Sequence, residues 1–407
     1  MKKLTLLFLM GAVAASAGAQ RMKIYRGHVC VNVPAAAAGE MTFAEGGTRL
    51  NVMGAAYDLA EVDSIIVDRG EVAEASVGVR YAGTEAFVEM SADVAPQLAV
   101  AVDGAHVSIT ADPSLATEVA YRLSGTSADG SFFMDGEYKA TVELDGLTLT
   151  STRGAAIDIA NGKRIAVVLT DGTTTTLADC TGGEQKACFF VNGHAEFKGG
   201  GTLLLTGNTK HAFASDEYTQ LKASTGTIRV LGAVTDGFHV DQYLQMDGGT
   251  LDIRGTGSDC IDVSLTKDDT DEMNGEVYIN GGTITMDVAA EDTKGLKAER
   301  DIAIAGGTLR ATVTGDGCKG IKTDSNLLVK QADPAIPVLI EMTISGKTYM
   351  PDDPELESKC RAIKTDGDFT FDGGTIIVHN EGTGERDVDV DGVYTYMSGQ
   401  YSFTLKN

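Results

Sequence analysis

The sequence has no tryptophan, and only 7 of its 407 residues are prolines. Aromatic residues make up 6% of the chain, whereas glycine occurs 49 times. Frequent glycines are typical of chains that turn tightly between short elements. Together with the scarcity of proline, they predict many short strands joined by tight turns and argue against a helical protein.

Positive charge is also scarce. Lysine and arginine number 33 against 58 aspartates and glutamates, which gives a net charge of -25 at pH 7. A protein that binds nucleic acid neutralises phosphates with a basic surface, so nucleic acid is not an expected partner. The acidity is typical either of cation binding or of a surface that stays soluble outside the cell.

Long apolar runs are absent after the first residues. The stretch "MKKLTLLFLMGAVAASAGA", residues 1–19, combines two lysines, an apolar run and small residues at Ala17 and Ala19, which predicts a cleavable export signal. No later run approaches the roughly 18 apolar residues that a membrane-spanning helix needs. We therefore expect an exported protein without a membrane span, in the periplasm or at the cell surface, with a monomer favoured.

Two phrases recur along the second half of the chain. One is a glycine pair and threonine followed by alternating apolar residues: "GGTLLL" from 200, "GGTLDI" from 248, "GGTITM" from 281, "GGTLRA" from 306 and "GGTIIV" from 373. The other is an apolar residue that leads a short charged strand: "FFVN" from 189, "FASD" from 213, "FHVD" from 238, "IDVS" from 261, "LKAE" from 296, and "IKTD" from 321 and from 363. The leading residues return about every two dozen positions, and two longer gaps, with "LTKDDTDEMNG" and "ADPAIPVLIEMTISGKTYMPDDPELESK", predict inserted loops.

The polarity within each phrase alternates with a period of two, which predicts strands. One repeat has too little apolar surface to fold alone, so the repeats should stack and bury a continuous column. The predicted fold is all-β: a parallel β-helix over residues 117–407. Residues 20–116 lack the repeat, and Asp103-Gly104 between alternating apolar residues predicts a hairpin, so we expect a small all-β N-terminal domain there.

Stacking would turn scattered polar residues into outward columns, because residues one and three places after each leading residue point away from the core. One column contains Lys297, Lys322 and Lys364. Acids close most strands or stand in the turns before them, and we take the following as candidate calcium ligands: Asp216, Asp236, Asp241, Asp259, Asp316, Asp324 and Asp366. Calcium takes six to eight oxygen ligands, which carboxylates from neighbouring coils would supply. The alternative is a surface lattice of ion pairs between the two columns.

Two further motifs allow two interpretations each. "DVDVDG", residues 387–392, matches the start of a calcium-binding loop, but position twelve is Ser398 instead of glutamate, and a strand with an acidic face fits equally well. The six cysteines lack the paired spacings of a zinc site, and export favours disulfides. Cys318–Cys360 and Cys180–Cys188 are the plausible pairs, with unpaired buried thiols as the alternative. The six histidines are scattered, which favours ordinary surface or packing roles.

The segments "KHAFASDEYTQLKASTGTIRVLGAVTDGFHVDQYLQMDGGTLDI" and "DGCKGIKTDSNLLV" resemble a family of secreted bacterial carbohydrate-binding domains, over roughly residues 117–380. The resemblance implies a right-handed parallel β-helix akin to calcium-dependent pectate lyases. It also implies bound calcium and binding of plant-type polysaccharide, including acidic pectin-like chains. It carries over to Asp236, Asp259 and Asp316 in the turns and to Asp241, Asp324 and Asp366 at the strand ends. Cys260 replaces the glycine of the family's "GDGI" phrase, and "EDTKGL" replaces the whole phrase from 291.

Three functions therefore stay open. The first is non-catalytic, calcium-assisted binding of polysaccharide, with Lys297, Lys322 and Lys364 meeting the carboxylates of the polymer. The lack of tryptophan weakens a version of this based on stacking sugar rings. The second is a polysaccharide lyase with Lys319 or Lys322 as the base beside calcium-bound uronate. The third is a structural or adhesive surface protein without a sugar ligand.

Overall fold

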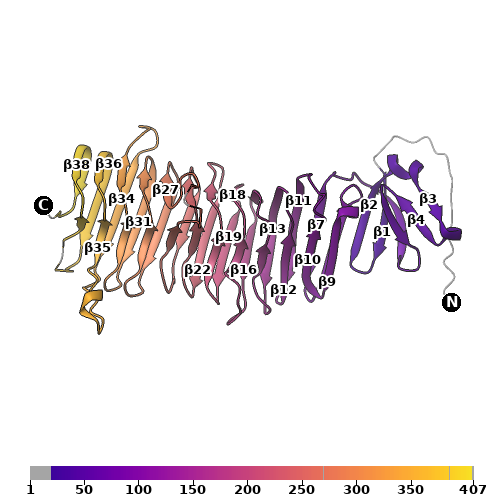
Figure 1. Ribbon diagram of the computed structural model, residues 1–407, viewed down its shortest axis with the longest axis horizontal. Helices are drawn as coiled ribbons and strands as arrows, with labels where there is room; N and C mark the ends of the chain where they lie inside the picture. Colours follow the sequence, from indigo (N-terminus) through magenta and orange to yellow (C-terminus); the bar gives the residue numbers. More distant parts are fainter. Residues whose placement is uncertain (1–19, 269, 385, 406–407) are drawn as a thin grey trace.

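The computed structural model describes residues 20–268, 270–384 and 386–405. The predicted export signal, residues 1–19, lies outside the described residues. Figure 1 shows an elongated molecule in which strands are stacked from the N-terminal to the C-terminal end. None of the helices in the described part is long and apolar enough to span a membrane.

Each coil of the solenoid contributes strands to three parallel ladders. The first ladder is a separate sheet, in which β9 (Leu98–Asp103) pairs antiparallel with β10 and the other neighbours are parallel. Its further strands are β10 (Ala105–Ala111), β12 (Gly130–Asp135), β14 (Ile157–Ile159), β17 (Ala187–Val191), β20 (His211–Ser215), β23 (Phe238–Asp241), β26 (Ile261–Ser264), β29 (Lys294–Ala298), β32 (Lys319–Thr323), β35 (Arg361–Thr365) and β37 (Val388–Val390).

The other two ladders belong to one large sheet, because four long strands bridge them. The second ladder contains β15 (Ile165–Leu169), β18 (Ala195–Lys198), β21 (Thr219–Leu221), β24 (Tyr243–Met246), β27 (Glu276–Ile279), β30 (Ile302–Ile304) and β33 (Leu327–Lys330). The third contains β16 (Thr174–Ala178), β19 (Thr202–Gly207), β22 (Thr227–Ala233), β25 (Thr250–Ile253), β28 (Thr283–Val288), β31 (Gly307–Val313) and β34 (Val338–Ile344). The bridging strands are β11 (Val119–Ser127), β13 (Ala140–Thr150), β36 (Phe369–Asn380) and β38 (Tyr394–Ser402).

The predicted register is confirmed. The leading residues pair directly with one another from coil to coil in the first ladder: Phe189, Phe213, Phe238, Ile261, Leu296, Ile321, Ile363 and Val388. All of them are fully buried. The parallel β-helix is therefore the fold of the chain, and its coils lie at the ordinary strand spacing of about 4.8 Å.

Aromatic rings fill part of the column. The ring centroids of Phe213 lie 5.6 Å from Phe189, 4.8 Å from Phe238 and 5.3 Å from Phe197 on β18. Such ring pairs add to the burial of apolar area. These four phenylalanines therefore form part of the buried core.

The glycines of the "GGT" phrase lie at the corner before the third ladder. A Cβ at Gly201 would lie 2.4 Å from the carbonyl oxygen of Thr170 in the preceding coil. Gly249 has φ +84°, and its Cβ would lie 2.6 Å from Thr225 O. Neighbouring coils thus approach too closely for a side chain at this corner, which is why glycine recurs there.

The N-terminal part is all-β, as predicted, and its strands are joined to the solenoid. The strands are β1 (Gln20–Arg26), β2 (Val29–Pro34), β3 (Thr42–Ala44), β4 (Arg49–Val52), β5 (Ala55–Asp58), β6 (Ser64–Arg69), β7 (Ser76–Ala82) and β8 (Glu85–Ser91), with short 3-10 helices η1 (Ala35–Glu40), η2 (Glu45–Gly47) and η3 (Ala95–Gln97). β9 and β10 form the hairpin expected at Asp103-Gly104. β7 pairs in parallel with β11, and β10 with β12, so the ladders continue across the boundary expected between residues 116 and 117.

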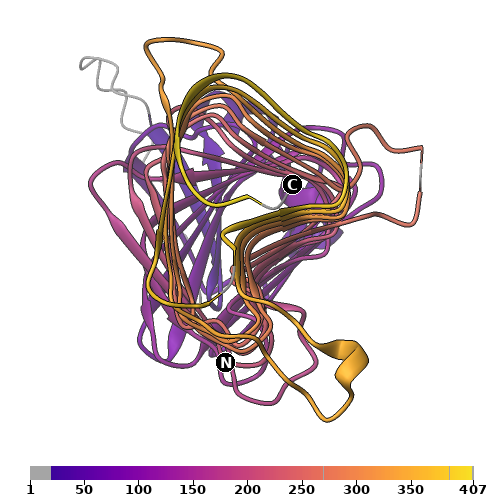
Figure 2. The ribbon, with the colours of Figure 1, turned by 90° about the vertical axis from the view of Figure 1, so that its left-hand side faces the viewer.

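The inserts differ from expectation in one case. The described residues of the first insert, 265–268 and 270–275, contain no strand, as expected. The second segment includes β34, a regular strand of the third ladder, so it forms two loops: residues 331–337 before β34, and a longer insertion after it that contains η4 (Pro354–Leu356). Figure 2 shows this insertion projecting from the coils, which bend inward where β35 follows it. The strand in "VLIEMTI" was not predicted, because the prolines on both sides of it indicated a loop.

The expected disulfides are wrong, because all six cysteines are free. Cys318 and Cys360 do occupy equivalent positions in adjacent coils, since Lys319 pairs with Arg361. However, the Cys318 thiol donates to Ala290 O at 2.8 Å. Burial raises the pKa of the Cys360 thiol to about 11, so this thiol stays protonated at neutral pH.

The stacked phenylalanines give the first prediction. Phe213→Ala should lower the free energy of unfolding by about 3–5 kcal/mol, because it leaves a cavity between three rings. Urea denaturation followed by circular dichroism would measure the loss. Leu231→Ala on β22, where the side chain is 50% exposed, is the control and should change stability by less than about 0.5 kcal/mol. Equal losses in the two variants would contradict the proposed core.

Candidate functional site

The outward residues of the first ladder form regular columns, which we call the outer face. One column runs through the residues that follow each leading residue: Phe190, Ala214, His239, Asp262, Lys297, Lys322, Lys364 and Asp389. The predicted stacking of Lys297, Lys322 and Lys364 is therefore confirmed. A second column contains Lys294, Lys319 and Arg361, which pair directly with one another, although the Arg361 side chain is buried. Six cations thus lie on three adjacent strands of an otherwise acidic protein.

The lysines of the outer face are held between carboxylates. Lys322 Nζ lies 2.6 Å from Asp324 Oδ1 and 2.6 Å from Asp366 Oδ2. Lys364 Nζ lies 2.6 Å from Asp391 Oδ1 and 3.4 Å from Asp366 Oδ1. The ion-pair lattice that the sequence allowed is therefore present, and it offsets the repulsion between like charges in adjacent coils.

Asp366 is the shared member of this lattice. Burial opposes its charge, but Lys322 and Lys364 outweigh that effect and hold the pKa of Asp366 below its usual value. Lys297 makes a similar pair, because its Nζ lies 2.8 Å from Asp262 Oδ1. Burial again opposes the charge, yet Asp262 raises the pKa of Lys297. Asp366 and Lys297 are therefore charged at neutral pH.

Lys319 has a different environment from the other lysines. Burial lowers the pKa of Lys319 and outweighs the opposing effect of Asp292, whose Oδ1 lies 3.5 Å from Nζ. Its Nζ also donates to Gly317 O at 2.7 Å and to the hydroxyl of Ser358. Nearby carboxylates raise the pKa of a lysine, but desolvation prevails at Lys319.

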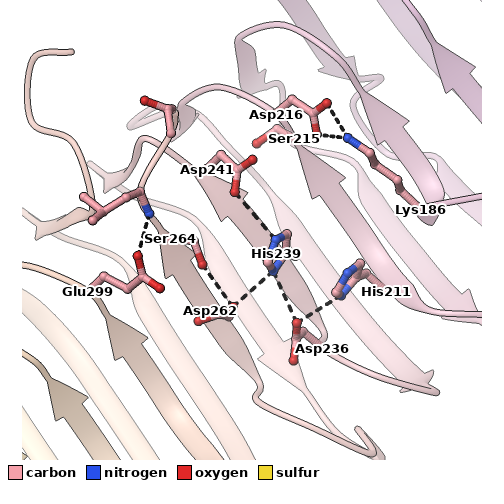
Figure 3. Close-up of polar contacts among 12 residues, drawn as sticks. Lys186, His211, Ser215, Asp216, Asp236, His239, Asp241, Asp262, Ser264 and Glu299 are labelled. Atoms are coloured by element: carbon pink, nitrogen blue, oxygen red, sulfur yellow. Dashed lines mark hydrogen bonds and ion pairs between the residues drawn. The ribbon is translucent and has the colours of Figure 1, made fainter. Parts of the chain in front are cut away.

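Towards the middle of the outer face, two histidines converge on one carboxylate (Figure 3). His211 Nδ1 lies 3.0 Å and His239 Nδ1 lies 3.3 Å from the same atom, Asp236 Oδ2. His239 Nδ1 also lies 3.1 Å from Asp262 Oδ2, and its Nε2 lies 3.6 Å from Asp241 Oδ1. The two imidazole rings are stacked, with centroids 4.4 Å apart.

The charges in this cluster stabilise one another. Burial disfavours a charged imidazole, but Asp236 and Asp262 outweigh it and raise the pKa of His239 to about 10. Burial likewise opposes the Asp236 carboxylate, yet its contacts with His211 and His239 hold the pKa of Asp236 well below its ordinary value. His239 is therefore an imidazolium at neutral pH, clamped between two carboxylates.

The predicted calcium ligands do not form one group. Asp236 and Asp241 lie beside His239, while Asp324 and Asp366 surround Lys322. The other three have separate partners: Asp216 pairs with Lys186 at 2.6 Å, Asp259 accepts the Lys294 amide at 2.7 Å, and Asp316 accepts the Lys347 amide at 2.7 Å. Burial raises the pKa of Asp259 to about 6.

The segment "DVDVDG" forms a strand. Val388–Val390 is β37, the last strand of the first ladder. Asp387 is buried and accepts the Thr404 amide at 2.6 Å, while Asp389 Oδ2 lies 3.7 Å from Arg361 Nε. The strand interpretation is thus confirmed, and the acidic residues of the motif belong to the protein's own polar network.

The histidine cluster is what sequence reasoning missed. His211 lies two places before the leading residue Phe213, and His239 lies one place after Phe238. The signal was available for His239, because the repeat places the residue after each leading residue on the outward side. It was not available for His211, because strict alternation predicts an inward side chain two places before Phe213. Treating the histidines as scattered ignored the register.

Comparisons with known proteins agree with this architecture. A family model described as "carbohydrate-binding domain-containing protein" matches residues 103–385. The chain belongs to this family.

A relative of the same description from Acetivibrio thermocellus is 28% identical over 139 residues, which cover 32% of this chain and 48% of the relative. The chain thus spans about half the length of that curated relative. A solved structure of a polysaccharide lyase-like protein from C. thermocellum, a gadolinium derivative, superposes with a TM-score of 0.52 at 23% identity. That match covers 65% of this chain and 99% of the other, and it supports the fold of this member of the carbohydrate-binding family.

The raised pKa of His239 predicts a pH dependence of stability. Because the pKa is about 10 in the folded protein and about 6.5 when unfolded, the ion pairs contribute fully below pH 6.5 and are lost as the pH rises through 10. His239→Gln should therefore cost about 1–3 kcal/mol at pH 6.5, and the cost should shrink towards pH 10. Urea denaturation at a series of pH values measures it.

His194→Gln is the control for this series. Burial lowers the pKa of His194, so the titration of this histidine changes the stability of the protein only at acidic pH. The stability difference between this variant and the wild type should stay constant between pH 7 and pH 10. A constant difference for His239→Gln over the same range would contradict the clamped imidazolium.

Proposed function

We propose that this protein binds an extended polysaccharide with carboxylate groups, such as a pectin-like plant polymer, along the outer face, without cleaving it. In this proposal calcium bridges the polymer and the acids at the strand ends. Membership of the carbohydrate-binding family supports polysaccharide as the class of ligand. In this proposal the protein is exported, and the outer face is the surface that binds the polysaccharide.

The single observation that carries the proposal is the cation column of Lys297, Lys322 and Lys364. These lysines repeat at the strand spacing of about 4.8 Å along a rigid solenoid. A linear polymer also presents its groups at regular intervals, so several lysines can meet successive carboxylates of one chain. The pKa of Lys297 is raised, which suits a group that stays charged while it binds.

Exchange of partners makes such binding feasible. The side chains of Lys322 and Lys364 are only 15% and 17% exposed, whereas the acids that pair with them are 40–60% exposed. A uronate would therefore reach each lysine from the side of these acids and take over part of its contact with aspartate. The released carboxylates of Asp324, Asp366 and Asp391 then need a counter-charge, and calcium with its oxygen ligands supplies it.

The double variant Lys322→Ala/Lys364→Ala tests the binding surface. It should weaken binding to polygalacturonate by at least about tenfold, because two charge-assisted contacts are lost. Affinity electrophoresis in gels with and without polygalacturonate and calcium measures the effect. Lys330→Ala on β33, whose side chain pairs loosely with Asp372 on another face, should bind as the wild type does.

The variant Asp324→Asn/Asp366→Asn separates calcium from charge alone. It should bind polygalacturonate equally with calcium and with a chelator, whereas the wild type should bind more tightly with calcium. Equally tight binding by the wild type with and without calcium would contradict the role of calcium as a bridge. Equal binding by the wild type and the double lysine variant would contradict the outer face as the binding surface.

Lys319 gives a second candidate, a polysaccharide lyase. Its lowered pKa is the property that a catalytic base needs, and the structural relative is described as polysaccharide lyase-like. Incubation with polygalacturonate and calcium, followed by ultraviolet absorbance of the unsaturated product, tests it. Product formation that disappears in Lys319→Ala would establish the lyase, and no absorbance change over many hours would leave binding as the function.

A further inference from the structure

The cluster of His211, Asp236 and His239 lies N-terminal to the cation column and takes no part in the proposed polymer contacts. Its donor atoms face one another from two adjacent coils: His211 is on β20, His239 is on β23, and Asp236 is in the turn before β23. One atom of each of the three residues lies within 4.8 Å of the other two. Such a set of imidazole and carboxylate donors is unusual for a packing role.

The distances match those between ligands of a small metal ion. A tetrahedral ion with bonds of about 2.0–2.1 Å holds its ligand atoms roughly 3.3 Å apart. The corresponding separations here are 3.0 Å for His211 Nδ1 to Asp236 Oδ2, 3.3 Å for Asp236 Oδ2 to His239 Nδ1, and 3.1 Å for His239 Nδ1 to Asp262 Oδ2. Asp262 lies next to the cluster through its contact with His239, although it does not belong to the group of donor atoms that all lie within 4.8 Å of one another.

We propose that His211, Asp236 and His239 form a binding site for a divalent transition-metal ion such as zinc, with the carboxylate of Asp262 beside the fourth position. The inference does not depend on the proposed polysaccharide function. Two imidazoles favour zinc, nickel or copper, whereas calcium prefers an all-oxygen set. The site is thus chemically distinct from the calcium sites expected at the strand ends.

The surroundings hold the ligands in place. Asp236 Oδ1 accepts the Asp259 amide at 3.0 Å, which leaves Oδ2 to face the imidazoles. Lys297 Nζ bonds the other oxygen of Asp262 at 2.8 Å. β20 and β23 pair in parallel, so the backbone fixes the separation of the two histidines. Outer contacts of this kind orient ligands before the metal binds.

Metal binding has to displace the interactions seen without it. His239 carries a proton between Asp236 and Asp262, and the Thr235 hydroxyl lies 3.0 Å from His211 Nδ1. A dication between the same carboxylates replaces the imidazolium charge and adds one more. An occupied site would also tie the coil of β20 to the coil of β23.

Titration of the full chain with zinc chloride in a calorimeter tests the site, after treatment with a chelator. We expect one equivalent of zinc to bind, and His211→Gln and His239→Gln to weaken binding by roughly 100-fold or more. Cobalt(II) gives a second readout, since tetrahedral coordination with imidazole ligands produces a strong visible absorption that both variants should lose. His194→Gln, which removes a histidine outside the cluster, should bind like the wild type.

Circular dichroism of the metal-free variants shows whether they are folded. If His239→Gln does not fold, His211→Gln decides alone, because its ring lies at the edge of the cluster next to Thr235. Absence of zinc binding to the folded wild type would overturn the proposal. Binding that is unchanged in a folded His211→Gln or His239→Gln would overturn it as well.

Discussion

The structure depends on the hydrogen-bonded register between equivalent strands of successive coils. Once Phe213 pairs with Phe189 on one side and Phe238 on the other, each residue of a strand is fixed above its counterpart two dozen positions away. A shift by one residue would turn the buried side chains outward. The apolar column therefore selects the register, and the register in turn decides which polar residues become neighbours.

This register brings like charges close together, and the outer face offsets their repulsion by alternating lysines with aspartates. Identical positions in adjacent coils lie about 4.8 Å apart, so a repeated lysine meets another lysine. The chain places aspartates at the next outward position, where Asp366 contacts both Lys322 and Lys364. In the middle coils the same positions hold His239 and Asp262, which makes that region a different chemical site on the same face.

Much of the fold was predictable because the repeat period and the alternation of polarity are local signals. The leading residues, the lysine column and the corner glycines follow from them directly. The continuation of the ladders through β7 and β10 was not predictable, because those coils lack the "GGT" phrase. Predicting the histidine cluster would have required both the register of the strands and the directions of the side chains. The free thiol of Cys318 depends on a hydrogen bond to Ala290 that no spacing reveals.

The central claim is that the outer face of the first ladder is the surface that binds polysaccharide. Chemical footprinting of lysines with an acetylating reagent, with and without polygalacturonate and calcium, tests it most directly on the unmodified protein. The account predicts that the polymer slows acetylation of Lys297, Lys322 and Lys364, while Lys198 and Lys330 on the second ladder react at unchanged rates. Unchanged rates at all five lysines, or protection confined to Lys198 and Lys330, would contradict it.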